Sequence, residues 1–141
     1  METPQLIQGN IHTDERGILK FMNELDMSII KRFYTIQNAN TDIVRAWQGH
    51  QIESKWFCVV NGSYKIGLVR VNDFENLDPT LQPAYYVLSA ENHQVLYVPK
   101  GYANGFIALE PESVLMVFSD HLLEDCKEDN IRLDMNLWPL K

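Results

Sequence analysis

The sequence predicts an all-β fold, either an antiparallel sandwich or a barrel. Short runs rich in β-branched and aromatic residues recur along the chain, and Gly, Pro or Asn residues separate them. The expected strands are residues 17–22, 30–37, 43–49, 55–60, 63–71, 84–89, 94–99, 105–109 and 113–119. Many short strands at regular spacing, divided by turn residues, are typical of sandwiches and barrels.

The segments between these runs carry recognisable turn chemistry. Asn61-Gly62 predicts a two-residue hairpin, because both positions tolerate a positive φ angle. Residues 99–101 and 110–112 predict two further turns, and residues 72–83 predict an exposed loop with two X-Pro pairs. Residues 122–133 are expected to form a short helical or irregular segment.

Size and charge limit the possible functions. The 141 residues are expected to form one domain, and 45% hydrophobic with 11% aromatic residues indicates a globular protein. The net charge of −7 argues against nucleic acid or an anionic membrane as a partner. A phosphorylated ligand would therefore need a local basic pocket, for which Arg16, Arg32, Arg45 and Lys55 are the candidates.

The cysteines and the N-terminal residues predict a cytoplasmic, reduced protein. Cys58 lies in the apolar run WFCVV and is expected in the core; one disulfide with Cys126 is possible, but two cysteines make no framework. The segment METPQLIQGN has no apolar core of a signal peptide, and no apolar stretch reaches membrane-spanning length.

Residues 44–62, VRAWQGHQIESKWFCVVNG, are the strongest functional signal. They place Arg45, His50 and Lys55 on strand-like sequence, where buried charge is costly unless it has a partner. An anionic ligand would supply that partner, so the segment predicts a binding pocket. On a regular strand Gln48 and His50 share one face and Arg45 the other, unless a bulge near Gly49 changes the alternation.

Several motifs occur in the order typical of one family. Residues 14–17 (DERG) resemble D-x-R-G, residues 44–48 (VRAWQ) a strand R-G-aromatic/Leu-H, and residues 55–62 (KWFCVVNG) the pattern K-L-V-x-V-x-x-G. Residues 89–92 (SAEN) and 96–106 (LYVPKGYANGF) resemble S-x-E-N followed by P-x-G-F-A-H-G-F. Together these motifs resemble the cupin-fold dTDP-4-dehydrorhamnose 3,5-epimerases and dTDP-sugar 3,4-ketoisomerases, over residues 11–134.

The resemblance implies a cupin jelly-roll β-barrel (double-stranded β-helix) that forms a homodimer and binds a nucleotide sugar. It implies isomerisation or epimerisation of a nucleotide-linked 4-keto-6-deoxy sugar, with dTDP as the nucleotide, in bacterial surface polysaccharide biosynthesis. Arg45 would bind the pyrophosphate, Lys55 would hold the enolate or keto oxygen, and His50 would be the base while Gln48 orients the substrate. Further substrate-binding candidates are Arg16, Arg32, Asn104, Tyr34 and Tyr102.

The departures from the family pattern fall on catalytic positions. Gln48 stands where the epimerases have their catalytic His, whereas His50 falls on the second His of the ketoisomerases. Asn104 replaces another His, and the acid Tyr of the epimerases aligns near Met116. One candidate base without this Tyr favours ketoisomerase chemistry.

Two other interpretations stay open at the level of sequence. The first is a non-catalytic cupin that binds a nucleotide sugar and has lost the base and the acid of the epimerases. In the second, His50 is a hydrogen-bonded structural residue, Lys55 faces solvent and Arg45 forms a surface ion pair.

The sequence predicts no cofactor and no catalytic metal. Metal-binding cupins use H-x-H on one strand with a later Glu and His, whereas this strand reads Gln48-Gly49-His50 and the later motif holds Asn104.

Overall fold

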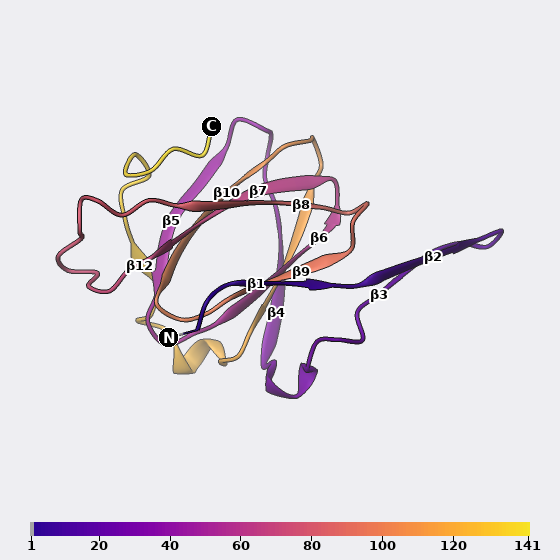
Figure 1. Cartoon of the computed structure of the whole chain (residues 1–141), viewed down its shortest axis with the longest axis horizontal. Coiled ribbons are helices and arrows are strands. Elements are labelled where there is room, and N and C mark those ends of the chain that lie inside the picture. The colour runs from indigo at the N-terminus through magenta and orange to yellow at the C-terminus, as the bar shows by residue number, and fades with distance from the viewer. Residues whose placement is uncertain (1) are drawn as a thin grey trace.

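Two five-stranded antiparallel sheets form the body of the protein in the computed structural model, which describes residues 2–141 (Figure 1). The strands are β1 (Gln5–Gln8), β2 (Asn10–Asp14), β3 (Gly17–Phe21), β4 (Arg32–Gln37), β5 (Val44–His50), β6 (Lys55–Asn61), β7 (Ser63–Arg70), β8 (Ala84–Ser89), β9 (Gln94–Val98), β10 (Tyr102–Ala108), β11 (Val114–Ser119) and β12 (Ile131–Arg132). One sheet has the order β1-β9-β6-β11-β4, and the other has the order β12-β5-β10-β7-β8. The predicted all-β antiparallel architecture is confirmed.

Each of the predicted runs overlaps one of these strands, whereas β1, β2 and β12 were not predicted. These three strands are short, and most of their residues are exposed. They lack the alternation of buried and exposed residues on which sequence-based strand prediction depends.

The main core lies between the two sheets. Alternate residues of each strand point to the same side, so the apolar residues at these positions meet in one layer. This inner core consists of Phe57, Val59, Tyr64, Ile66, Leu68, Leu88, Ala90, Leu96, Val98, Tyr102, Phe106, Ala108, Leu115 and Val117.

The Asn61-Gly62 turn does not make the predicted hairpin. β6 pairs with β9 and β11, whereas β7 pairs with β8 and β10, so this turn carries the chain from one sheet to the other. Gly62 has a φ angle of 71°, as the turn chemistry requires. The local prediction was correct for the backbone of the turn and wrong for the strand pairing, which the packing of distant strands decides.

The turns at residues 99–101 and 110–112 also cross between the sheets, since β9 and β11 belong to one sheet and β10 to the other. By contrast, β7 and β8 pair directly as a hairpin around the predicted loop, residues 72–83. This loop is not wholly exposed, because Phe74 is buried against β5 at Gly49. A Cβ atom at Gly49 would lie 2.1 Å from the Phe74 ring, so glycine allows this contact.

The C-terminal segment is less helical than expected. A single 3-10 turn covers Leu123–Asp125, and residues 131–132 form strand β12 at the edge of β5. A second 3-10 turn covers Met27–Ile29. Because these helical turns have three residues each, none of the helical segments within residues 2–141 could span a bilayer.

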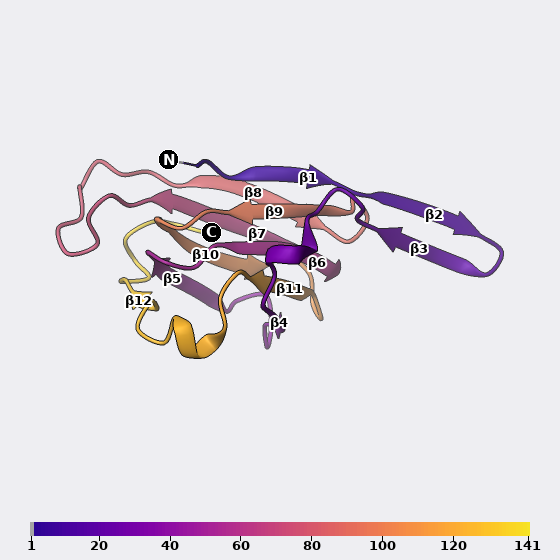
Figure 2. The same cartoon turned by 90° about the horizontal axis from the view of Figure 1, so that it is seen from below.

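Strands β2 and β3 form a separate two-stranded hairpin that projects from the body of the protein (Figures 1 and 2). The hairpin carries the Asp14-Glu15-Arg16-Gly17 motif at its tip. Ile18 and Leu19 on β3 are 66% and 60% exposed, so the hairpin presents apolar surface outside the core.

Candidate active site

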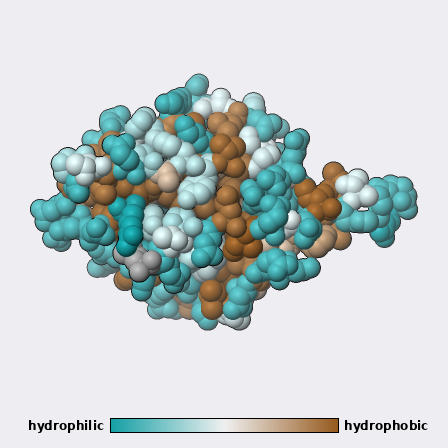
Figure 3. Space-filling model, in the orientation of Figure 1, coloured by the Kyte–Doolittle hydropathy of each residue, from teal (hydrophilic) through white to brown (hydrophobic). Residues whose placement is uncertain are grey.

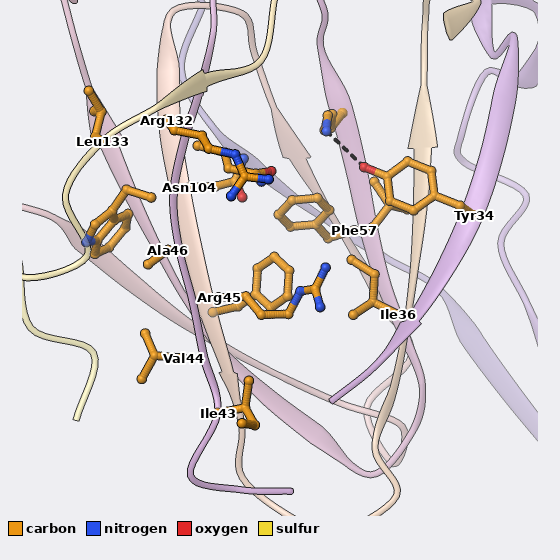
Figure 4. Close-up of a pocket in the computed structure, with 15 residues that line it drawn as sticks. Tyr34, Ile36, Ile43, Val44, Arg45, Ala46, Phe57, Asn104, Arg132 and Leu133 are labelled. Atoms are coloured by element: carbon orange, nitrogen blue, oxygen red, sulfur yellow. Dashed lines mark hydrogen bonds between the residues drawn. The ribbon is translucent and has the colours of Figure 1, made fainter. Parts of the chain in front are cut away.

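A cavity of about 460 Å³ opens between the inner edges of the two sheets (Figure 4). Strands β4 and β5 form opposite walls of this cavity, and β6 and β10 contribute further lining residues. The lining consists of Tyr34, Ile36, Ile43, Val44, Arg45, Ala46, Trp47, Gln48, Lys55, Phe57, Asn104, Phe106, Val117, Arg132 and Leu133. Its polar groups are mainly cations and amides set among apolar side chains, which suits an anionic organic ligand.

Arg45 and Gln48 both line this cavity, although a regular strand would point them to opposite faces. Along β5 they are three residues apart, whereas their partners on β10, Phe106 and Asn104, are two residues apart. The extra residue is a β-bulge, and it changes the alternation between Arg45 and Gln48. The bulge therefore lies earlier in the strand than Gly49, the position that the sequence left open for it, and falls at residues 46–47.

Gly105 on β10 faces this bulge and leaves room for it. A Cβ atom at Gly105 would lie 2.7 Å from the Ala46 Cβ and 2.9 Å from the Trp47 ring. We expect Gly105→Ala to lower the free energy of unfolding by about 1–3 kcal/mol, because overpacking forces the strands apart. Urea unfolding followed by tryptophan fluorescence would measure this; unchanged stability would show that the bulge shifts without cost.

Arg132 is a second cation of the cavity, and sequence reasoning missed it. It lies on β12, where it pairs with Gln48 of β5. Figure 4 shows Arg132 and Arg45 both pointing into the cavity from the same side. The apolar neighbours Ile131 and Leu133 could have suggested a strand with one inward residue, but the whole segment was expected to be helical or irregular.

Lys55 starts β6, and its side chain lines the cavity. Its side chain is only 8% exposed, its Nζ donates to the Tyr34 hydroxyl at 2.9 Å, and the same atom lies 3.7 Å from Glu53 Oε1. A cation that is held by two partners is already positioned to stabilise negative charge that develops on a substrate oxygen.

His50 ends β5 and lines a smaller recess of about 210 Å³ beside the cavity. Tyr34, Gln48 and Lys55 line both spaces, so the two adjoin. Nδ1 of His50 lies 2.8 Å from the Asp129 carbonyl oxygen. Because a carbonyl only accepts, Nδ1 carries the proton, and Nε2 holds the lone pair of the neutral ring.

The environment of His50 favours this neutral form. Burial, followed by the charge of Lys55, lowers the pKa of His50 below its usual value, so the ring is uncharged near neutral pH. Nε2 is buried and has no hydrogen-bond partner within residues 2–141. A neutral imidazole with a free Nε2 is chemically able to accept a proton.

Glu53, which no sequence motif singled out, lies between these groups. Its carboxylate accepts a hydrogen bond from Arg32 at 2.8 Å and another from the Ser119 hydroxyl. Burial alone would raise the pKa of Glu53, but Lys55 and the Ser119 hydrogen bond, with His50 and Arg32, lower it below its usual value. The carboxylate is therefore ionised although its side chain is only 4% exposed.

His50, Glu53 and Asp129 lie near enough to meet at one ion, but their two carboxylates already have other partners. The Asp129 carboxylate accepts from the backbone N–H groups of residues 51–53, and the Glu53 carboxylate faces Arg32 and Lys55. The carboxylate oxygens of Asp129 and Glu53 are therefore already engaged by donors.

The structure places the remaining predicted residues in different surroundings. Asn104 pairs with Gln48 and lines the cavity, and Tyr34 faces it from the opposite wall. Arg32 lies in the recess, where it pairs with Glu53. Tyr102 is buried in the inner core, and burial raises its pKa.

Arg16 lies outside both the cavity and the recess. It sits at the tip of the β2–β3 hairpin, its side chain is 81% exposed, and it pairs with Asp14 at 2.7 Å. A role at the cavity of the same chain does not follow from this position.

Comparison with known proteins agrees with the predicted family. The sequence profile of dTDP-4-dehydrorhamnose 3,5-epimerase matches residues 3–137. A search of curated protein sequences finds no significant match.

Solved structures of low sequence identity share the fold. The chain is similar to the dTDP-4-dehydrorhamnose 3,5-epimerase of Bacillus anthracis with TDP and PPi bound (TM-score 0.77, 21% identity, 94% of this chain and 79% of that one). It is also similar to the sugar 3,4-ketoisomerase QdtA of Thermoanaerobacterium thermosaccharolyticum in complex with TDP (TM-score 0.71, 23% identity, 92% and 88%). A third similar structure is the rmlC epimerase of Mycobacterium tuberculosis (TM-score 0.75, 21% identity, 97% and 74%).

These matches confirm the cupin-type fold expected from the motifs, here built from two facing antiparallel sheets. The profile match covers nearly the whole chain, including both walls of the cavity. The chain therefore belongs to the dTDP-4-dehydrorhamnose 3,5-epimerase family and is an enzyme of the nucleotide-sugar epimerase and isomerase class.

Proposed function

We propose that the protein isomerises or epimerises a nucleotide-linked 4-keto-6-deoxy sugar, with dTDP as the nucleotide, in bacterial surface polysaccharide biosynthesis. The observation that carries the proposal is the position of Lys55. Its buried side chain lines the cavity to which Arg45 and Arg132 also contribute. The two arginines would bind the diphosphate, and the keto group of the sugar would lie toward Lys55.

The reaction needs a proton to leave the carbon next to the keto group. In the proposed step Nε2 of His50 accepts this proton, and the electron pair of the C–H bond moves to the keto oxygen as an enolate. Lys55 stabilises the enolate oxygen, and Gln48, which has no basic group, orients the sugar. Return of a proton to the same carbon from the opposite face gives the epimer. Delivery of the proton to the former keto carbon, while the proton of the adjacent hydroxyl group passes to the enolate oxygen, gives the isomer.

Tyr34 lies on the wall opposite β5 and hydrogen-bonds to Lys55, so it is suitably placed to donate a proton from the other face. Met116 is the position that aligns with the Tyr of the epimerases. It lies on β11 and pairs with Thr35 of β4, the residue next to Tyr34. This arrangement is compatible with both the isomer and the epimer as product, and product analysis by NMR would distinguish them.

Binding of dTDP is the first test. We expect saturating dTDP to raise the apparent stability, by about 2.7 kcal/mol at a concentration 100-fold above Kd, because it binds only the folded state. Arg45→Ala and Arg132→Ala should each weaken binding by roughly tenfold or more, since each removes a charge-assisted hydrogen-bond donor. Thermal shift and calorimetry with dTDP would measure both effects.

Arg70→Ala is the matched control for these two variants, because it removes an exposed arginine at the end of β7. If Arg45→Ala and Arg132→Ala bound dTDP as tightly as Arg70→Ala does, there would be no diphosphate site at Arg45 and Arg132. Transfer of deuterium from solvent into dTDP-4-keto-6-deoxyglucose then tests catalysis, and binding without transfer would support the non-catalytic alternative.

We also propose that the working form is a cytoplasmic homodimer of single cupin domains. The β2–β3 hairpin projects from the body, and apolar surface lies at its base (Figure 3). Burial of Ile18 and Leu19 against a second copy would be favourable, and it would offer Arg16 to the partner's cavity. The free thiols of Cys58 and Cys126 support a reducing compartment, and light scattering would test the dimer.

A further inference from the structure

Glu53 makes contacts that a simple structural carboxylate does not need. Its Oε2 accepts from Arg32 at 2.8 Å, while its Oε1 lies 3.4 Å from His50 Nδ1 and 3.7 Å from Lys55 Nζ. One pair with Arg32 would already satisfy the charge of this buried group. The second oxygen instead faces the two residues that the proposed reaction uses as base and oxyanion donor.

The charges around the recess explain why this matters. Arg32 and Lys55 are positive, and the carboxylates of Glu53 and Asp129 balance them when His50 is neutral. A proton taken by His50 adds a further positive charge in a buried place, close to Lys55. Without the carboxylate of Glu53 this imidazolium would face two cations with only Asp129 to offset them.

The orientation of His50 depends on the same contacts. Nδ1 donates to the Asp129 carbonyl and lies 3.4 Å from Glu53, so both groups hold the ring with Nε2 away from them. Nε2 is then the atom left to accept a proton, and it has no partner within the described chain.

We infer that Glu53 is a positioning residue: its carboxylate holds His50 and Lys55 in place and stabilises the imidazolium that forms when His50 takes the proton from the sugar. The inference rests on the proposed function. Electrons and protons balance, because the proton moves from carbon to Nε2 and the C–H electron pair moves to the enolate oxygen beside Lys55. Glu53 itself stays ionised throughout.

Charged and titratable groups from several elements surround His50. These groups are Arg32 and Tyr34 from β4, Glu53 from the β5–β6 connection, Lys55 from β6, Tyr102 from β10, and Cys126, Lys127 and Asp129 from the segment that follows β11. Lys55 disfavours the imidazolium, whereas Glu53 and Asp129 favour it. Removing the charge of Glu53 therefore lowers the pKa of His50 further.

Glu53→Gln tests this coupling, with kcat/KM for deuterium transfer into dTDP-4-keto-6-deoxyglucose measured as a function of pH. We expect the acid limb of the profile to move to lower pH, and kcat to fall by roughly tenfold or more because the base is weaker. Binding of dTDP should stay near that of the wild type, since Glu53 does not line the larger cavity. NMR of the ¹⁵N-labelled His50 ring should show the same downward shift without any substrate.

Two variants complete the design. Glu53→Asp keeps the charge but moves it away from His50 by the length of one methylene group. The acid limb of its kcat/KM profile should therefore lie between those of the wild type and Glu53→Gln. If Glu53→Gln does not fold, the shift of the acid limb in Glu53→Asp still tests whether the carboxylate of Glu53 acts on His50. Asp120→Asn is the control, because it removes a nearby carboxylate that binds the Ser54 N–H and His121 rather than His50.

The outcomes separate the two proposals. An acid limb and a His50 titration that stay unchanged in Glu53→Gln, or that move equally in Asp120→Asn, would overturn the role of Glu53. A wild-type protein that transfers no deuterium, but whose His50 titration shifts in Glu53→Gln, would overturn the proposed function alone and leave the coupling standing.

Discussion

Replacement of His50 by alanine should abolish deuterium transfer into dTDP-4-keto-6-deoxyglucose while leaving dTDP binding nearly intact. His50 supplies the only neutral imidazole at the two adjoining spaces within residues 2–141, and Gln48 cannot take a proton. Loss of a positioned general base typically costs about 10²–10⁴ in rate. Mass spectrometry or proton NMR of the recovered sugar would measure the exchange.

A control variant should lack a histidine that lies outside the site. His93, in the connection between β8 and β9 and away from the cavity lining, provides it, and His93→Ala should exchange deuterium normally. Full activity in His50→Ala would assign the base to another residue, of which Tyr34 is the first candidate. Weak binding of dTDP in His50→Ala would instead indicate that His50 acts by holding the pocket together.

Replacement of Lys55 by methionine should lower kcat by about 10²–10³, the cost of removing one preorganised donor to a developing oxyanion. Methionine keeps much of the length of the side chain, so the loss concerns the charge and the hydrogen bond to Tyr34. Because the ammonium acts mainly on the enolate, we expect KM to change less than kcat. Steady-state kinetics with the same sugar nucleotide would separate the two constants.

Lys65→Met is the matched control for this substitution. Lys65 lies on β7 with its Nζ 4.5 Å from the centre of the Tyr85 ring, away from the cavity. A fall of kcat in both variants would point to a general loss of structure. An unchanged kcat in Lys55→Met would show that the enolate oxygen is bound elsewhere.

Much of this site could be predicted because its residues lie on strands with clear patterns. Gln48, Lys55 and Asn104 line the cavity, as expected of residues in the motifs around them. The bulge in β5 was harder to place, since it depends on how Gly105 of a distant strand lets the backbone approach. From the sequence alone, Gly49 was the obvious candidate for the position of a bulge, because it lies between Gln48 and His50.

Arg132 and Glu53 could not be predicted for a different reason. Arg132 reaches the cavity because β12 adds to the edge of β5, and a two-residue strand carries no periodic signal. Glu53 lies in a connection, where acidic residues are usually solvated, and its burial results from Arg32, Ser119 and Lys55 closing over it. Both are consequences of tertiary contacts between segments far apart in the chain.

The turns that carry the chain from one sheet to the other have a consequence for how the protein folds. The consecutive strands β6 and β7 belong to different sheets, so each pairs with strands that are distant in the sequence. Strand β10 lies between β5 and β7, so these two strands join one sheet only when β10 has paired with both. Such non-local pairing makes folding slow. A truncated or partly synthesised chain that lacks β10 would therefore lack the cavity altogether, so that ligand binding reports completion of the fold.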